Sequence, residues 1–231
     1  MRYKAVLFDL DGTLVDSIPD IATSTNAMLT DLGLQTLSEK RISTFVGRGT
    51  DHLIWLSLQH VTQLSTPAPE LWQQAKHSFA QHYTAQTQAS VARVFPGVLE
   101  GLQLFKEAGC QLALVTNKPF QYVPDLLQLM QLEPFFEVVI GGDTCAEKKP
   151  HPLPFLHACT LLGVDPSAAL VIGDSSNDSV AARRAGIDVL IVPYGYNEGK
   201  NVQDLDCDGI VSTIVAAAHW AAQPKNNGFI D

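Results

Sequence analysis

KAVLFDLDGT, residues 4–13, joins a short apolar run to an acidic turn. Ala5–Phe8 has the length and composition of a buried strand, and the acidic residues after it end the run. Segments with apolar residues at helical spacing separate it from similar runs further on, which are Leu112–Val115, Val138–Ile140, Leu170–Ile172 and Val189–Val192. This alternation predicts an α/β fold, with a Rossmann-like core in which helices cover both faces of a parallel sheet.

A long segment directly after the first strand interrupts this alternation. It contains no convincing strand, and its helical patterns cover Ile18–Leu32, Leu53–Val61 and Leu71–Tyr83. Asp16 or Ser17 is placed to cap the first of these helices. We therefore expect a small α-helical cap at 16–90, inserted into a catalytic core made of residues 1–15 and 91–231.

The composition limits the classes of partner. With 231 residues, of which 46% are hydrophobic and 17% charged, the chain can bury a large core. Its net charge of -9 disfavours a nucleic-acid backbone or an anionic membrane as a general partner. No stretch approaches the roughly 18 apolar residues of a membrane span, and the start of the chain lacks a signal-peptide pattern. The four cysteines are scattered without a CxxC pair, so we expect reduced thiols and a cytoplasmic protein.

Four short polar signals stand where predicted strands end or helices begin. They are Asp9-Leu10-Asp11-Gly12-Thr13, Thr116-Asn117, Lys149-Pro150 and Gly173-Asp174-Ser175-Ser176-Asn177-Asp178. In an open parallel sheet, ligands bind beyond the carboxyl ends of the strands. The four signals are therefore expected to meet in one site.

The acidic residues of these signals indicate a metal site. Asp9, Asp11, Asp174 and Asp178 would place several carboxylates close together, which is unfavourable unless some are protonated or a cation lies among them. Oxygen ligands without His or Cys suit Mg²⁺. The sequence therefore predicts Mg²⁺ bound by this group of carboxylates.

The remaining residues suit phosphoryl transfer, which depends on positioning and charge neutralisation. Lys149 supplies positive charge, and the Thr116 hydroxyl can donate to phosphoryl oxygens. The backbone amides in the turns after the first two strands can also bind substrate, which gives candidate roles to Gly12, Thr13 and Asn117. A carboxylate nucleophile would form an aspartyl-phosphate, and an acid two residues further on could protonate the leaving oxygen.

These four signals, in this order, resemble motifs I to IV of the haloacid dehalogenase superfamily. The resemblance implies that Asp9 is the nucleophile and that Asp11 is the acid and base. It also implies Mg²⁺ held by Asp9, the backbone carbonyl of Asp11 and Asp174, with Asp178 supporting the metal mainly through water. Thr116 and Lys149 match the phosphate-contacting residues of the superfamily, and the helical insert resembles its small cap.

Finer matches are similar to the bacterial phosphoglycolate phosphatases. They are Phe95-Pro96-Gly97-Val98, Thr116-Asn117-Lys118-Pro119, Lys149-Pro150-His151-Pro152 and Tyr194-Gly195-Tyr196-Asn197. This similarity implies a phosphomonoester hydrolase that converts 2-phosphoglycolate to glycolate and phosphate. Arg48 stands in the cap where that family commonly has Asn, and it is either a guanidinium that grips a substrate carboxylate or a solvated side chain.

The same residues also suit other functions. The alternatives are a capped phosphatase for sugar phosphates, nucleotides or pyrophosphate, a β-phosphoglucomutase-like phosphotransferase, and a phosphate-sensing module without turnover. In each case the expected partner is a small anionic phosphorylated metabolite, and the protein is expected to be a monomer or homodimer.

Overall fold

The centre of the fold is a six-stranded parallel sheet with the order β5-β4-β1-β6-β7-β8. The computed structural model describes residues 1–223, apart from the side chain of Gln88. The strands are β1 (Ala5–Phe8), β4 (Gln111–Val115), β5 (Val138–Ile140), β6 (Ala169–Gly173), β7 (Asp188–Ile191) and β8 (Gly209–Ile210). The first strand lies in the interior of the sheet, which places the acidic turn after it at the middle of one edge.

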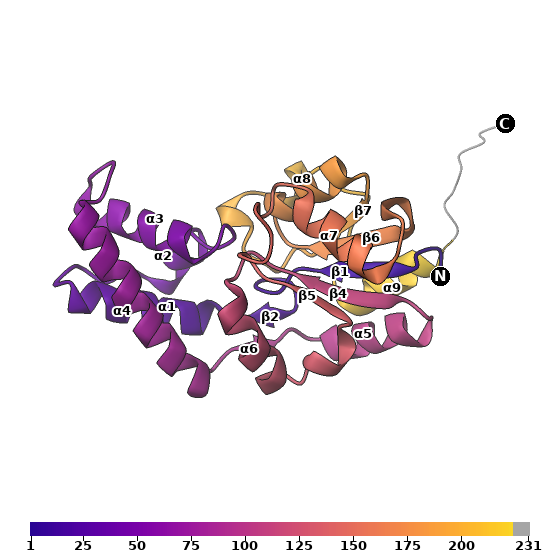
Figure 1. The fold of residues 1–231 in the computed structure, drawn as a ribbon, viewed down its shortest axis with the longest axis horizontal. Helices are drawn as coiled ribbons and strands as arrows, with labels where there is room; N and C mark the ends of the chain where they lie inside the picture. The colour runs from indigo at the N-terminus through magenta and orange to yellow at the C-terminus, as the bar shows by residue number, and fades with distance from the viewer. Residues whose placement is uncertain (224–231) are drawn as a thin grey trace.

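Helices cover both faces of the sheet, as expected (Figure 1). One face packs against α5 (Val98–Glu107), α6 (Val123–Leu129) and α9 (Ile214–Ala222), and the other against α7 (Leu153–Leu162) and α8 (Ser176–Ala185). Successive side chains of a strand point to opposite faces. Val6 and Phe8 accordingly join the first hydrophobic cluster and Ala5 and Leu7 the second, and all four are fully buried.

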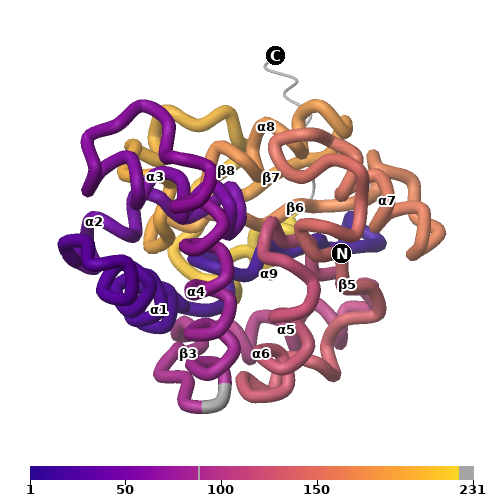
Figure 2. The backbone as a smooth tube through the Cα atoms, turned by 60° about the vertical axis from the view of Figure 1, so that its left-hand side comes forward, coloured from indigo at the N-terminus to yellow at the C-terminus, as the bar shows by residue number. Residues whose placement is uncertain are grey.

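A separate layer of helices lies beyond the carboxyl ends of the strands (Figures 1 and 2). It consists of α1 (Ile18–Asp31), α2 (Glu39–Ser43), α3 (Thr50–Thr62) and α4 (Pro69–Gln88). These helices share a hydrophobic cluster of their own, which includes Met28, Leu58 and Phe79. The chain enters and leaves the layer through β2 (Val15–Asp16) and β3 (Arg93–Val94), which pair antiparallel. The layer has the order and place expected of a cap. Its boundaries at 16–90 stay a prediction. The extent of the core also stays a prediction, and residues 224–231 lie outside the described residues.

The structure adds small elements that the sequence patterns did not predict. These are β2, β3, β8, α2, α9 and the short 3₁₀ helices at Phe120–Tyr122, Glu133–Phe135, Pro166–Ala168, Asn197–Gly199 and Val202–Asp204. Strands of two residues are too short for an alternating pattern to be read. None of the helices in the described chain is both long enough and apolar enough to span a membrane.

The predicted capping of α1 by a side chain is wrong. Ser17 is the N-cap residue, yet no side chain accepts a capping hydrogen bond there. The Ser17 hydroxyl donates to Asp11 Oδ1 at 2.6 Å, and Asp16 Oδ1 accepts from the Tyr196 hydroxyl at 2.8 Å. Both side chains are therefore drawn away from the helix end by partners at the carboxyl edge of the sheet.

Candidate active site

Lys149 joins three strand ends at the floor of the site. Its ammonium lies 2.7 Å from Asp9 Oδ1 and 2.7 Å from Asp178 Oδ1, and it donates to the Val115 carbonyl at 2.7 Å. Asp9 follows β1, Val115 ends β4, and Asp178 lies in the first turn of α8 after β6. Only 3% of Lys149 is exposed, so these contacts form largely out of water. The sequence signals therefore meet as predicted.

Burial and neighbouring charges perturb the acidity of these groups. Burial lowers the pKa of Lys149, but the carboxylates of Asp178 and Asp9 raise it by more, so its pKa ends above the usual value. Burial raises the pKa of Asp9 to about 7, with Lys149 opposing the rise and Asp178 adding to it. Burial also raises the pKa of Asp174, together with the charges of Asp178 and Asp9. The site thus holds more negative charge than its lysine neutralises.

Three carboxylates form a group that fits a metal ion. Ligand atoms of Asp9, Asp174 and Asp178 all lie within 4.8 Å of one another, and all three residues are buried. Three carboxylates facing the single ammonium of Lys149 leave two negative charges uncompensated, which equals the charge of a divalent cation. Oxygen-only ligands favour a hard cation. The residues present therefore fit a divalent metal ion at this position.

Two local features hold the acidic residues after β6. Ser175 and Asp178 form a capping box at the start of α8, in which Asp178 Oδ2 accepts from the backbone and hydroxyl of Ser175. Asp174 Oδ2 accepts from the backbone of Tyr196 at 2.6 Å. Gly12 makes room for this carboxylate, because a Cβ at its φ of +90° would lie 2.4 Å from Asp174 Oδ2. Because Asp178 Oδ1 accepts from Lys149, both oxygens of Asp178 are engaged by protein donors.

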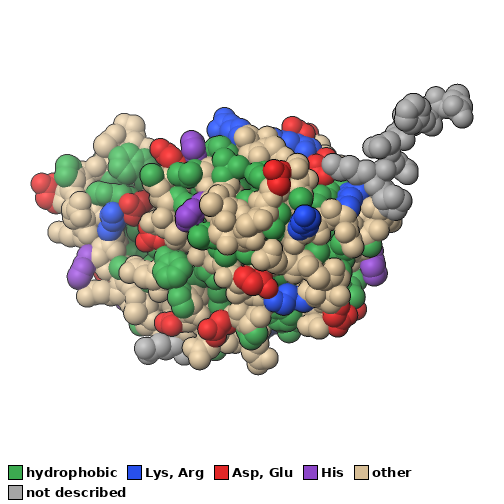
Figure 3. Space-filling model, turned by 45° about the vertical axis from the view of Figure 1, so that its right-hand side comes forward, with side chains coloured by type: hydrophobic (Ala, Val, Ile, Leu, Met, Phe, Trp, Pro, Cys, Tyr) green, Lys and Arg blue, Asp and Glu red, His purple; other side chains and the backbone are tan. Residues whose placement is uncertain are grey.

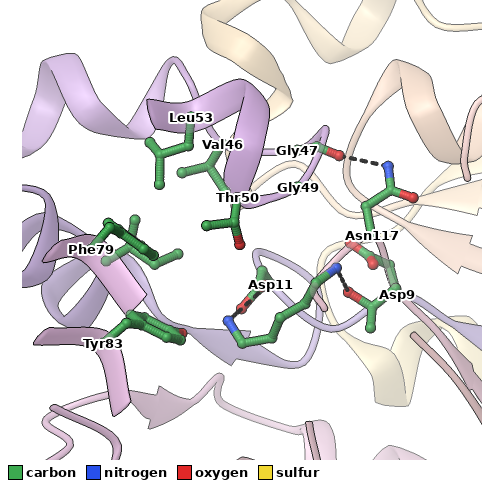
Figure 4. A pocket seen from close by; sticks show the side chains of 13 residues that line it. Asp9, Asp11, Val46, Gly47, Gly49, Thr50, Leu53, Phe79, Tyr83 and Asn117 are labelled. Atoms are coloured by element: carbon green, nitrogen blue, oxygen red, sulfur yellow. Dashed lines mark hydrogen bonds and ion pairs between the residues drawn. The ribbon is translucent and has the colours of Figure 1, made fainter. Parts of the chain in front are cut away.

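A small pocket opens between the strand ends and the helical layer (Figure 4). Its cavity volume is about 50 Å³. The core contributes polar lining residues, which are Asp9, Asp11, Thr116, Asn117 and Lys118. The helical layer contributes a mostly apolar wall, made of Ile21, Val46, Gly47, Gly49, Thr50, Leu53, Phe79 and Tyr83. A polar floor beneath an apolar roof suits a small anionic ligand shielded from water.

Asp11 lies beside the metal group without belonging to it. Its carboxylate accepts from Lys118 Nζ at 3.1 and 3.2 Å and from the Ser17 hydroxyl, and it lines the pocket next to Asp9. The predicted metal contact of Asp11 through its backbone carbonyl stays a prediction. The position of the carboxylate suits the predicted acid and base.

The predicted substrate-binding residues of the core occupy different places. Thr116 lines the pocket, and its hydroxyl accepts from the backbone of Lys118 at 3.1 Å. Gly12 and Thr13 are outside the pocket lining, and the buried Thr13 hydroxyl has no hydrogen-bond partner in the described structure. The Asn117 side chain lines the pocket, but its amide group donates to the carbonyls of Gly47 and Lys149. The donors of Asn117 therefore hold the backbone in this structure.

Arg48 points away from the pocket. Its guanidinium pairs with Glu198 at 2.7 Å, its side chain is 46% exposed, and it is outside the pocket lining. The cap loop around it is held to the core, because the carbonyl of Gly47 accepts from Asn117 Nδ2 at 2.9 Å and from Asn177 Nδ2 at 3.3 Å. In this arrangement Arg48 ties the cap loop to Glu198 of the core.

Sequence reasoning missed Lys118, which is 7% exposed and lines the pocket. It directly follows Thr116-Asn117, so its place in that motif was the available signal. Positive charge at the site comes from Lys118 and Lys149. On the face shown in Figure 3, by contrast, Lys and Arg side chains are scattered among acidic ones.

Sequence reasoning also assigned no role to Tyr196, which ties the core to the start of α1. Its hydroxyl accepts from the backbone of Ser17 at 3.0 Å and of Ile18 at 3.3 Å, and it donates to Asp16. We expect Tyr196→Phe to lower the free energy of unfolding by about 1–3 kcal/mol, because the mutation leaves partly buried polar groups unpaired. Urea titration measures this loss. Tyr122→Phe is the control, since that hydroxyl makes no hydrogen bond within residues 1–223, and an equal loss in both variants would contradict the assignment.

Comparison with known proteins agrees with this geometry. The phosphoglycolate phosphatase of Thiobacillus denitrificans is 44% identical over 215 residues, which cover 93% of this chain and 94% of the relative. That of Nitrosospira multiformis is 42% identical over 214 residues, which cover 93% of each protein. A crystal structure described as a predicted phosphoglycolate phosphatase from Haemophilus somnus superposes with a TM-score of 0.91. It is 33% identical and covers 96% of this chain and 99% of its own.

The sequence pattern of the haloacid dehalogenase-like hydrolases matches residues 6–192, which include every strand-end signal of the site. The observed parallel sheet, with its acidic turn after β1 and its buried lysine, is the arrangement that the motifs predicted. This chain belongs to the haloacid dehalogenase-like hydrolase family.

Proposed function

We propose that this protein is a Mg²⁺-dependent phosphatase that hydrolyses 2-phosphoglycolate to glycolate and phosphate through an aspartyl-phosphate on Asp9. The observation that carries the proposal is the Asp9 carboxylate on the floor of a small pocket, 2.7 Å from the Lys149 ammonium and next to Asp11. The small cavity favours a substrate of few atoms. The relatives named phosphoglycolate phosphatase support the choice of substrate.

In the first step an Asp9 oxygen attacks the phosphorus, and the bond from phosphorus to the glycolate oxygen breaks. Asp11 gives its proton to that leaving oxygen, which departs as the glycolate hydroxyl. Lys149 holds the Asp9 carboxylate in place from the side of β4 and α8. The Thr116 hydroxyl, in the lining of the pocket, can donate to a phosphoryl oxygen.

In the second step water attacks the phosphorus of the aspartyl-phosphate, and the bond from phosphorus to Asp9 breaks. Asp11, now a carboxylate, takes the proton of that water and returns to its starting state. The Ser17 hydroxyl and the Lys118 ammonium orient Asp11 through both steps. The roof formed by Leu53 and Phe79 excludes bulk water from the reacting groups.

Mg²⁺ is the metal ion that the proposal assigns to Asp9, Asp174 and Asp178. When bound, it screens the repulsion between the Asp9 carboxylate and the phosphoryl oxygens. Asp9 and Asp174 would contact the ion directly. Asp178 would support it mainly through water, because its two oxygens already accept from Lys149 and Ser175.

The pH dependence of stability tests the metal site. Burial raises the pKa of Asp9 to about 7 and that of Asp174 above its usual range, so metal-free folded protein binds more protons than the unfolded chain. The stability that Asp9 contributes is complete below about pH 4 and is lost as the pH rises through about 7, and that of Asp174 is lost as the pH rises through its own raised pKa. Mg²⁺ needs the deprotonated carboxylates, so we expect it to raise the melting temperature by several degrees at pH 8 and by less at pH 5.

Differential scanning calorimetry with MgCl₂ measures this effect. NaCl at equal ionic strength controls for screening, and Asp174→Asn should remove most of the Mg²⁺-specific rise. An increase of equal size at both pH values would contradict the assignment. EDTA should also stop phosphate release, and added Mg²⁺ should restore it.

A substrate panel tests the activity directly. Release of free phosphate is measured with Mg²⁺ from 2-phosphoglycolate, sugar phosphates, nucleotides and pyrophosphate. A preference for 2-phosphoglycolate of at least about tenfold in kcat/KM, a difference of ~1.4 kcal/mol, supports the proposal. A preference for another substrate would keep the family chemistry and overturn the choice of substrate.

We propose a cytoplasmic enzyme whose partner is a small anionic phosphorylated metabolite, with no role in nucleic-acid or membrane binding. We expect a monomer or homodimer, and size-exclusion chromatography with light scattering distinguishes these from larger assemblies.

A further inference from the structure

Lys118 is a buried cation that the phosphoryl chemistry does not use directly. Its side chain is 5% exposed, and its ammonium lies 3.1 and 3.2 Å from the two oxygens of Asp11. The same ammonium lies 4.8 Å from the centre of the Tyr83 ring on α4. Among the described residues that line the pocket, Lys118 is the only Lys, Arg or His. The charge therefore sits at the boundary between the core and the helical layer.

The two buried lysines have different places, because only Lys118 lines the pocket. Lys149 is committed to Asp9 and Asp178 at the phosphoryl end, and Lys118 reaches from Asp11 to the roof. From Asp9 the pocket continues past Asp11 to Thr50 and Phe79 of the helical layer, which leaves this direction for the part of a substrate beyond its phosphoryl group (Figure 4). We propose that Lys118 binds the carboxylate at the non-reacting end of the substrate and so determines specificity, an inference that rests on the proposed function.

The chemistry around Lys118 favours an anion over a neutral group. An ammonium has three N–H donors, which on Lys118 are directed at the two oxygens of Asp11 and toward Tyr83, and a ligand anion would share them. The nearby wall is mostly apolar through Ile21, Leu53 and Phe79, and Thr50 and Tyr83 supply its two hydroxyl groups. A carboxylate would gain a charge-assisted hydrogen bond from Lys118, which is roughly twice as strong as a neutral one.

The amino end of α3 adds to this preference. Gly49 is its N-cap residue, no side chain caps the helix, and both Gly49 and Thr50 line the pocket. The first N–H groups of a helix lack partners within it and carry partial positive charge. The amino end of α3 therefore adds partial positive charge at one place in the otherwise apolar roof.

Arg48, the residue expected from the sequence to grip the carboxylate, is engaged elsewhere. It pairs with Glu198 on the exposed side of the cap loop, outside the pocket lining. A substrate carboxylate would have to displace Glu198 to reach it. Lys118 already lies in the pocket, so the proposal assigns the substrate carboxylate to Lys118 of the core and not to Arg48 of the cap.

The experiment compares two substrates that differ at one end. Lys118→Met is assayed on 2-phosphoglycolate and on 2-hydroxyethyl phosphate, in which a hydroxymethyl group replaces the carboxylate. We expect kcat/KM to fall on both substrates, because Asp11 loses an orienting partner, and to fall roughly tenfold further on 2-phosphoglycolate, with this additional loss mainly in KM. Lys118→Arg keeps the charge and should restore part of the loss. The exposed Lys148→Met is the matched control and should change neither value by more than about twofold.

Each outcome decides the inference. Equal losses on both substrates would mean that Lys118 acts only by orienting Asp11, and a selective loss in Arg48→Met with none in Lys118→Met would move the contact to Arg48. Wild-type enzyme gives a second test that needs no variant: a ratio of kcat/KM values near one for the two substrates overturns the inference. The panel described above judges the proposed function separately, because phosphoglycolate turnover without carboxylate selectivity leaves that function standing.

Discussion

Asp9→Asn is expected to lower kcat for phosphate release by at least about 10⁴-fold, because an amide cannot take the phosphoryl group as a carboxylate does. The fold should survive. Asn is close to Asp in size, and Lys149 keeps its contacts with Asp178 and the Val115 carbonyl. Removing one carboxylate also reduces the excess negative charge around Asp174 and Asp178.

The measurement has two parts. Steady-state phosphate release gives the loss of turnover, and circular dichroism with thermal melting shows that the variant is folded. Rapid quenching with radiolabelled substrate should trap label on the wild-type protein and none on Asp9→Asn. Asp206→Asn makes the same chemical change at a side chain that is 78% exposed and should leave turnover unchanged. Covalent label on Asp9→Asn, or turnover within about tenfold of wild type, would refute the nucleophile assignment.

Lys149→Met is expected to have the largest effect on stability. The substitution leaves the carboxylates of Asp9 and Asp178, which are 8% and 1% exposed, without the ammonium that lies 2.7 Å from each. Breaking a buried ion pair from one side costs about 3–5 kcal/mol, because an uncompensated charge remains buried. For a chain of this size, the melting temperature should fall by roughly 10 °C in metal-free buffer.

Lys148→Met is the matched control for this variant as well. Its side chain is exposed, so we expect a change within about 0.5 kcal/mol. Mg²⁺ should recover part of the stability of Lys149→Met, since a divalent cation also compensates the carboxylates, while phosphate release should stay at least about 100-fold below wild type. Equal melting temperatures for Lys149→Met and Lys148→Met without metal would show that the ion pairs carry little of the stability.

Several parts of the fold were readable from the sequence because they depend on short-range patterns. The strands at Ala5–Phe8 and Val138–Ile140 have the bounds that the apolar patterns predicted. β8 and the β2–β3 ladder were missed, since two residues carry no periodicity and their pairing depends on distant partners. The capping of α1 was predicted wrongly because the Ser17 side chain is turned toward Asp11, to which its hydroxyl donates, and accepts from no N–H group of the helix.

The residues of the candidate site also fall into those that the sequence could identify and those that it could not place. Asp9, Asp174 and Lys149 could be chosen from the sequence, because the carboxyl ends of parallel strands meet at one edge and the motifs follow those ends. Lys118 and Arg48 could not be placed, since local sequence does not determine which way a loop side chain points. Packing decided both, with Lys118 between Asp11 and Tyr83 and Arg48 on Glu198.

The sequence by itself determined the α/β class of this protein, the position of its helical insert and the carboxylates of its catalytic floor. Each follows from the spacing of residues within one strand, helix or turn. Only the tertiary structure decided the small volume of the pocket, the hydrogen bond from Asn117 to the Gly47 carbonyl and the positions of Arg48 on Glu198 and of Lys118 beside Asp11. The physical reason is that these features are contacts between the core and the helical layer, and such contacts depend on how surfaces from distant parts of the chain meet.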